Sequence, residues 1–139
     1  MVNRTVRPLI GRRDVLGHAE IDDDHLAISD CWFCAVNSEP LQFPFLIARL
    51  KKLMRVHFDH EVALMHSVGG ALCECHRMEH RTMLDLCDQV SVLSTENWPR
   101  AQSLLRNKFP RLVRSHIACM DQIAVLFINA NQRAAQISH

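Results

Sequence analysis

The sequence has no tyrosine, and it has little glycine, proline or aromatic residue of any kind. Among 139 residues there are four glycines and five prolines, and aromatic residues make up 6%. Glycine and proline mark turns and interrupt helices, so their scarcity argues against many short strands and favours long helices with short connections. A chain of this length fits one domain, and we expect a single domain over residues 1–139 with its core at about 16–134.

Neither an excess of one charge nor a long hydrophobic run is present. Lysine and arginine number 16 against 15 aspartates and glutamates, mixed along the chain without the basic stripe of a nucleic-acid-binding protein. No stretch approaches the roughly 20 apolar residues of a membrane span, and residues 1–13 lack the apolar segment of a signal peptide. We therefore expect a cytoplasmic protein with no nucleic acid or membrane partner.

Cysteine and histidine, in contrast, are abundant, with six and nine residues. In a reducing compartment the cysteines are expected to stay thiols and to pack as small apolar side chains. The pairs Cys31/Cys34 and Cys73/Cys75 have spacings that occur in zinc sites, but the sequence after them fits no familiar zinc finger. Packing is therefore the expected role, with structural zinc and a redox role of Cys73, Cys75 or Cys119 near a metal as alternatives.

Four helical stretches are expected, at about 22–36, 41–67, 71–93 and 99–134. Asp22 or Asp23 is expected to cap the first stretch, and Gly69 and Gly70 are expected to end the second. Pro110 lies inside the last stretch and should kink or split it. Four helices joined by short connections predict an all-α, up-down-up-down four-helix bundle.

Histidines and carboxylates recur at one-turn spacing on these helices. His57 and Glu61 are four residues apart, and so are His76 and His80, which puts each pair on one helix face with the side chains within about 6 Å of each other. His25 lies near the start of the first helix, on the face that its apolar neighbours assign to the core. Each of the first three helices therefore offers possible metal ligands.

The last helix offers His116 and Asp121, but their spacing is different. They are five residues apart, about 140° round an ideal helix, so they do not share a face. A π-bulge between them, or a carboxylate that reaches sideways across the bundle axis, would bring both to one site. With this pair, the candidate ligands are His25, His57, Glu61, His76, His80, His116 and Asp121.

Five imidazoles and two carboxylates are too many for one tetrahedral zinc ion, but they suit two iron ions. Imidazole is a ligand for iron, zinc and copper, and a carboxylate can bridge two hard cations. On two octahedral ions, two bridging carboxylates, five imidazoles and an oxo or hydroxo bridge leave one position open. A small ligand such as dioxygen would bind there. Manganese or zinc remain alternative occupants of the same residues.

Four ordered motifs carry this pattern, namely Ile21–His25, His57–Met65, His76–His80 and His116-Ile117 with Asp121. Together they resemble the hemerythrin family, especially its single-domain bacteriohemerythrins, over roughly residues 16–128. The resemblance implies that one iron is held by His76, His80 and His116, the other by His25 and His57, and that Glu61 and Asp121 bridge them. It also implies an apolar dioxygen pocket, which keeps water away, at Ile28, Phe58, Val113 and Ile117.

The sequence departs from the family pattern at several positions. Asp24 stands where the family often has glutamine before the first ligand histidine, and Leu112 replaces a tryptophan. Val62 replaces a second glutamate, and the usual N-terminal aromatic residues are missing. Because no ligand is lost, these departures bear on the pocket shape, the rate of autoxidation and the partner surfaces rather than on metal binding.

Three functions remain open at this stage. The expected one is reversible dioxygen binding for storage, delivery or sensing, without enzymatic turnover beyond a possible weak oxidase or peroxidase activity. The alternatives are a diiron redox enzyme that acts on peroxide or nitric oxide, and a signalling module that needs a partner protein. A ferritin-like diiron oxidase would need Glu-x-x-His pairs, which are absent. The oligomeric state stays open between monomer and homodimer.

Surface or supporting positions are expected for the remaining histidines, and core packing for a set of apolar residues. The histidines are His18, His60, His66 and His139, and the apolar residues are Met54, Leu64, Met65, Met78 and Met83.

Overall fold

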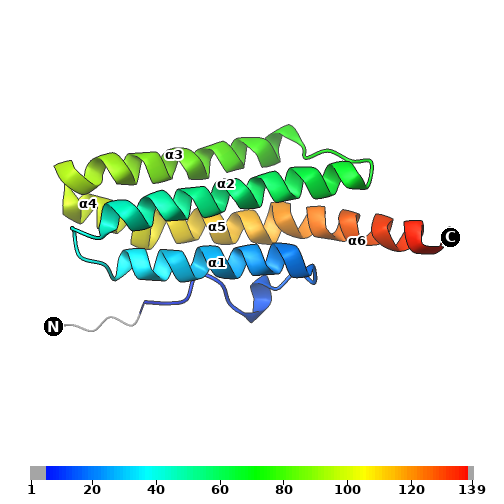
Figure 1. Cartoon of the computed structure of the whole chain (residues 1–139), viewed down its shortest axis with the longest axis horizontal. Coiled ribbons are helices and arrows are strands. Elements are labelled where there is room, and N and C mark those ends of the chain that lie inside the picture. The colour runs from blue at the N-terminus through cyan, green and yellow to red at the C-terminus, as the bar shows by residue number, and fades with distance from the viewer. Residues whose placement is uncertain (1–5, 138–139) are drawn as a thin grey trace.

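The computed structural model describes residues 6–137 and consists of helices that run up and down side by side (Figure 1). The first three arms are α1 (Ala19–Val36), α2 (Phe43–Ser67) and α3 (Glu74–Glu96), preceded by a short 3-10 turn, η1 (Arg12–Asp14). The fourth arm comprises α4 (Trp98–Ser103), η2 (Leu104–Lys108), α5 (Phe109–His116), η3 (Ile117–Asp121) and α6 (Gln122–Ile137). The predicted all-α four-helix bundle is confirmed. His139 lies outside the described residues.

The start of α1 differs from the prediction. The N-cap is His18, whose ring accepts the backbone N–H of Ile21 at 3.4 Å. Asp22 lies inside the first turn and accepts the backbone N–H groups of Leu16 and Gly17, at 2.9 and 3.0 Å. The acidic run still lies near the positive end of the helix dipole, but Asp22 fastens the preceding loop to α1 instead of capping the helix. The prediction that Asp22 or Asp23 caps α1 was therefore wrong.

Two glycines end α2, as predicted. Gly69 has a φ of +78°, a left-handed conformation that glycine adopts without strain. The N–H of Gly70 donates to the carbonyl of Met65 at 2.9 Å, and a Cβ on Gly70 would lie 2.7 Å from the ring of Phe127 on α6. The turn therefore brings the end of α2 close to α6, and α3 begins three residues later than predicted.

Pro110 is accommodated by a π-helical turn. In η2 the N–H of Phe109 donates to the carbonyl of Leu104, five residues back. In that register the carbonyl of Leu105 would pair with the nitrogen of Pro110, which carries no hydrogen. The indole N–H of Trp32 on α1 donates to this carbonyl instead, at 2.7 Å. Pro110 was expected to kink or split the last stretch; a π turn is found there, and the helical path is not split, because it continues beyond the turn (Figure 1).

The core consists of two apolar clusters with a polar layer between them along every arm. On α1, Ile28 belongs to the larger cluster and Ile21 to the smaller, and His25 lies between them in sequence. On α2, Glu61 lies in the same way between Phe58 and Met65. The candidate ligands therefore occupy the level of the bundle where one apolar cluster gives way to the other.

The N-terminal segment before α1 packs along the bundle. Leu9 is fully buried, and Ile10 packs against the larger cluster. The guanidinium of Arg114 on α5 donates to the carbonyls of Pro8 and Leu9, at 2.9 and 3.3 Å. This segment, which shows no helical periodicity in the sequence, is thereby part of the folded core.

Several expectations about packing need correction. Met54, Met65 and Met83 are buried as expected, but Met78 is 52% exposed because it lies on the outer face of α3. Of the cysteines, two are buried and four are exposed, namely Cys34, Cys73, Cys75 and Cys119. The expectation that the cysteines pack inside the protein therefore holds only for Cys31 and Cys87.

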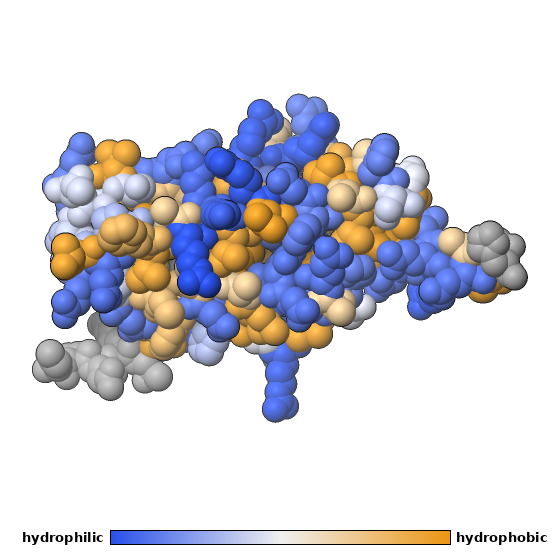
Figure 2. Space-filling view, viewed as in Figure 1, coloured by the Kyte–Doolittle hydropathy of each residue, from blue (hydrophilic) through white to orange (hydrophobic). Residues whose placement is uncertain are grey.

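The outer surface is mixed in character. Figure 2 shows hydrophilic residues over much of one face, with apolar patches between them. Among residues 6–137, no helix combines the length and apolar composition that crossing a bilayer requires.

The hydrogen bond from Trp32 to Leu105 yields a prediction for folding stability. Trp32→Phe should lower the free energy of unfolding by about 1–3 kcal/mol, because a buried carbonyl loses its donor. Urea denaturation measures this loss. Trp98→Phe, at a half-buried indole that packs against Phe43, is the matched control and should cost less. Equal losses in the two variants would contradict the importance of this hydrogen bond.

Candidate metal centre

All seven predicted ligands are buried in the polar layer of the bundle. Every buried polar or charged residue in the described part of the chain is one of them, and each is at most 6% exposed. The set comprises His25, His57, Glu61, His76, His80, His116 and Asp121. The four arms therefore converge on one internal cluster of imidazoles and carboxylates.

A π turn brings His116 and Asp121 together, as one of the two predicted solutions requires. In η3 the N–H of Gln122 donates to the carbonyl of Ile117, five residues back, which adds one residue to the turn. As a result Nε2 of His116 lies 2.9 Å from Oδ1 of Asp121. The spacing of five residues is therefore compatible with a shared site.

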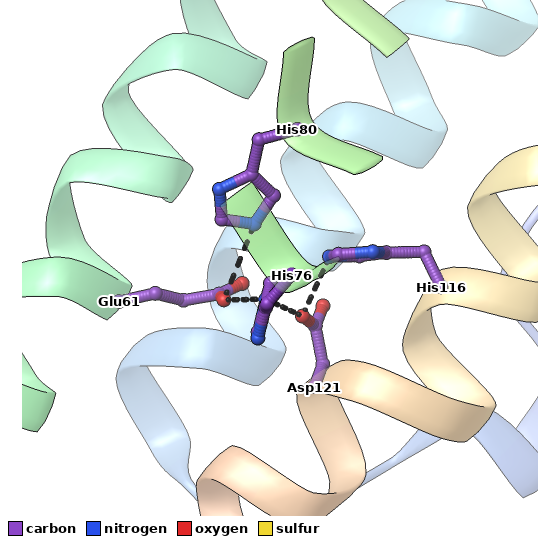
Figure 3. A group of neighbouring side chains, drawn as sticks. All are labelled: Glu61, His76, His80, His116 and Asp121. Atoms are coloured by element: carbon purple, nitrogen blue, oxygen red, sulfur yellow. Dashed lines mark ion pairs between the residues drawn. The ribbon is translucent and has the colours of Figure 1, made fainter. Parts of the chain in front are cut away.

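The carboxylate of Glu61 faces imidazoles on two sides. Its Oε1 lies 2.5 Å from Nε2 of His57, the residue one turn earlier on α2. Its Oε2 lies 2.8 Å from Nε2 of His76 and 3.5 Å from Nε2 of His80, both on α3 (Figure 3). The two oxygens of Glu61 thus point to different sets of histidines.

The carboxylate of Asp121 divides its oxygens in the same way. Oδ2 lies 2.9 Å from Nε2 of His25 and 3.5 Å from Nε2 of His57. Oδ1 lies 2.9 Å from Nε2 of His116 and 3.2 Å from Nε2 of His76 (Figure 3). Both carboxylates therefore lie between the same two sets of imidazoles.

These contacts define two adjacent positions for a cation. Within each position the potential ligand atoms lie within 4.8 Å of one another. The two-histidine position consists of His25, His57, Glu61 and Asp121, and the three-histidine position consists of His76, His80, His116, Glu61 and Asp121. The positions share both carboxylates but no imidazole.

The buried polar atoms of the cluster are suited to coordinate a pair of metal ions, whereas they satisfy one another poorly by hydrogen bonds. Although they lie close to one another, several buried atoms make no hydrogen bond of acceptable geometry among the described residues, including both oxygens of Glu61, Oδ1 of Asp121 and Nε2 of His76, His80 and His116. Burying carboxylate oxygens without donors is costly, and a coordinated cation would compensate for that cost. Imidazole nitrogen and carboxylate oxygen together are typical ligands of iron and zinc.

Both carboxylates are ionised in this environment. Burial by itself would raise the pKa of Glu61, but the facing imidazoles of His57 and His76 outweigh it and lower the pKa to about 2. For Asp121 burial acts in the same direction, yet the imidazoles around it hold the pKa well below its ordinary value. Because a metal ligand must be deprotonated, both side chains are ready to bind a cation.

The imidazoles respond unequally to burial and to these carboxylates. Burial would lower the pKa of His57, but contacts with Asp121, Asp24 and Glu61 raise it well above the ordinary value. The same competition, with Asp121 and Glu61 opposing burial, raises the pKa of His76 to about 9. At His80 burial prevails and lowers the pKa. Without metal, the raised pKa values of His57 and His76 favour protonated rings beside the carboxylates, so metal binding has to displace protons.

Asp24, which in the sequence is notable only as a departure from the family pattern, contacts a candidate ligand in the structure. Its Oδ2 accepts the Nδ1–H of the candidate ligand His57 at 3.0 Å and lies 2.8 Å from Nδ1 of His60. Burial would raise the pKa of Asp24, but these two hydrogen bonds lower it. His60, which is expected at the surface or in a supporting position, has a side chain that is 38% exposed and contacts the same carboxylate oxygen as the candidate ligand His57.

The four predicted pocket residues line one small cavity. The cavity has a volume of about 20 Å³, and its walls include Ile28, Phe58, Val113 and Ile117 together with four of the candidate ligands, His25, His57, His116 and Asp121. The ring of Phe58 stacks on His80, with centroids 3.8 Å apart and planes 10° apart. Sequence reasoning missed three further walls, Ile10, Met54 and Met83.

The fold and the site together define a helical bundle with an internal cluster of imidazoles and carboxylates that could hold cations, and comparison with known proteins agrees. A family model described as the hemerythrin HHE cation binding domain matches residues 3–126. A protein named bacteriohemerythrin, from Ralstonia nicotianae (strain ATCC BAA-1114 / GMI1000), is 24% identical over 113 residues, which are 81% of this chain and 82% of that protein. No solved structure matches significantly. The chain belongs to the hemerythrin family.

The raised pKa of His76 predicts how the stability of the metal-free protein depends on pH. Folding favours the protonated ring, so this stabilisation is present below about pH 6.5 and is lost as the pH rises towards about 9. After removal of metal by a chelator, the melting temperature should therefore fall across this range. Metal loading should flatten the dependence, because the ligands are then neutral imidazoles.

Two variants make this test specific. His76→Gln should reduce the pH dependence between about 6.5 and 9. His66→Gln, at an exposed histidine outside the cluster, should keep the dependence of the unmodified protein. A melting temperature that rises with pH in the metal-free protein would contradict the assignment.

Proposed function

We propose that this protein holds two iron ions and binds dioxygen reversibly, for storage, delivery or sensing, without enzymatic turnover. One iron would be held by His25 and His57 and the other by His76, His80 and His116. Glu61 and Asp121 would bridge the two ions, together with an oxo or hydroxo group. When bound, a ferrous pair supplies the electrons that dioxygen takes up.

The observation that carries this proposal is that the two oxygens of each carboxylate face different cation positions. Oε1 of Glu61 faces the two-histidine position, whereas its Oε2 faces the three-histidine position. Asp121 repeats this arrangement from the opposite arm with Oδ2 and Oδ1. A carboxylate that bridges two cations needs this geometry, whereas a single zinc site would not require two shared carboxylates.

The unequal number of imidazoles supports a place for an added ligand. The two-histidine position has one protein ligand fewer than the other. Both of its imidazoles border the cavity of about 20 Å³, whereas the three-histidine position reaches the cavity with the imidazole of His116 alone. A cavity of that size can hold a molecule as small as water or dioxygen. Dioxygen would therefore bind at the two-histidine position.

The walls of the cavity favour an apolar diatomic molecule over water. Ile28, Phe58, Val113 and Ile117 offer no hydrogen-bonding side chain, and the polar groups in the wall, His25, His57, His116 and Asp121, would be engaged by the cations. Water would then lack the several polar partners that it needs in a cavity. Arg114 holds the N-terminal segment in place through Pro8 and Leu9, and Ile10 of this segment closes one wall. Excluding water and protons would slow the loss of superoxide and the formation of inert ferric iron.

Anaerobic loading with Fe²⁺ followed by air tests the proposal directly. We expect two irons per chain and a visible absorption band that appears in air and bleaches under argon over repeated cycles. Slow, one-way oxidation to a ferric spectrum would contradict reversible binding and would favour a redox enzyme or a sensor of peroxide or nitric oxide. One zinc ion per chain after purification would overturn the diiron site.

Glu61→Ala is predicted to reduce metal binding at both positions, because the two oxygens of Glu61 face different positions. His80→Ala removes a ligand of the three-histidine position alone and should leave the other position able to bind. Metal analysis after dialysis distinguishes the two results. Glu74→Gln, at an exposed glutamate on α3, is the control and should bind two irons.

The same variants should differ in the stability that metal adds. Bound metal stabilises a fold by an amount that grows with the logarithm of its affinity, so loading should raise the melting temperature of the unmodified protein and of Glu74→Gln. Glu61→Ala should show little increase. An equal increase in all three proteins would contradict the role of Glu61.

A further inference from the structure

One candidate ligand differs from the others at its outer nitrogen. All five imidazoles direct Nε2 towards the carboxylates, so Nδ1 is the outer atom of each ring. Nδ1 of His57 donates to Oδ2 of Asp24 at 3.0 Å. Within residues 6–137, no other ligand imidazole has such a bond from its Nδ1 to a carboxylate.

The three-histidine position lacks an equivalent contact. Nδ1 of His116 is 3.6 Å from Oε1 of Glu79, which is too long for a hydrogen bond, and the side chain of Glu79 is 36% exposed. At the two-histidine position itself, Nδ1 of His25 is buried without a partner among the described residues. The contact with Asp24 is therefore specific to one ligand of one position.

Asp24 is held in place from two sides. It precedes His25 on α1, its side chain is only 18% exposed, and α1 packs against α2. His60, one turn after His57 on α2, lies with Nδ1 2.8 Å from the same Oδ2. Two histidines of one helix thus fix the carboxylate against the outer face of the ligand ring.

A carboxylate in this place has known effects on a metal-binding histidine. It fixes the tautomer with the proton on Nδ1 and the lone pair on Nε2, it orients the ring, and it increases the basicity of the ligand. Asp24 also adds a negative charge near one of the two cations. The glutamine that the family often has before its first ligand histidine would supply no charge there.

We propose that Asp24 is a positioning residue that acts through His57 to strengthen cation binding at the two-histidine position. The inference rests on the proposed pair of metal ions. It implies that the two positions differ in their affinity for a cation for a second reason besides their number of imidazoles. A more basic His57 would hold the cation at this position more tightly.

Titration of the metal-free protein with Co²⁺ under argon tests this inference without any dioxygen chemistry. The unmodified protein should bind two ions in two resolvable steps, followed by visible absorption and by competition with a chelator. Asp24→Asn should weaken one step by about 10–100-fold, the usual cost of removing such a supporting group, and leave the other step unchanged. Asp24→Leu, which loses the acceptor as well as the charge, should weaken that step further.

Asp23→Asn is the matched control. It removes the same charge from the adjacent, exposed residue of α1 and should leave both steps unchanged. Glu79→Gln is the control for the other position and should also have little effect, since Glu79 makes no hydrogen bond to His116. Equal affinities in the Asp24→Asn and Asp23→Asn proteins would overturn the role of Asp24.

A spectroscopic measurement separates positioning from a general effect on folding. In the Zn²⁺-loaded protein, nitrogen-15 NMR of the histidine rings should show His57 with its proton on Nδ1, and Asp24→Leu should shift the His57 resonances but not those of His80. Unchanged His57 resonances would overturn the inference. If the unmodified protein binds no pair of cations, the proposed function itself fails; if it binds two and Asp24 has no effect, only the present inference fails.

Discussion

Two carboxylates buried at the centre of an apolar bundle impose the constraint on which the rest of the structure depends. Glu61 is 0% exposed and Asp121 is 1% exposed, and a buried charge without compensation costs several kcal/mol. In the absence of metal, part of the compensation comes from facing imidazoles such as His57 and His76. Because all four arms contribute to the cluster, the bundle cannot form around these residues unless the arms meet at one level. The site and the fold therefore depend on each other, because the residues that would hold the metals also form the layer that separates the two apolar clusters of the core.

Much of this arrangement could be predicted from sequence because it rests on local periodicity. The one-turn spacing of His57 and Glu61 places both on one face of α2 whatever the neighbouring helices do. The five-residue spacing of His116 and Asp121 is equally local, and the π turn η3 resolves it in the way that helix geometry requires. The family resemblance then supplied the division of ligands into two sets, which periodicity alone does not contain.

The features that sequence did not reveal depend on how separate segments meet. The contact between Asp24 and His57 depends on the rotation of α1 about its axis relative to α2, which no spacing within either helix encodes. Ile10 reaches the cavity because Arg114 holds a segment that has no periodic pattern. The start of α1 was misplaced for a local reason, since an acidic residue suits both the cap and the first turn, and only the loop contacts of Asp22 distinguish the two.

The π turn at η3 also has a consequence for how this chain tolerates change in length. A π turn is an α-helix with one inserted residue, so it rotates everything that follows by about 100°. Ala124, Val125 and Ile128 of α6 face the smaller apolar cluster only in that rotated phase. Deleting one residue from η3 would thus displace Asp121 and turn the apolar side of α6 away from the core at once. The helical phase of the last arm is therefore fixed both by the position of Asp121 and by the packing of α6, and a change in length there would disturb both.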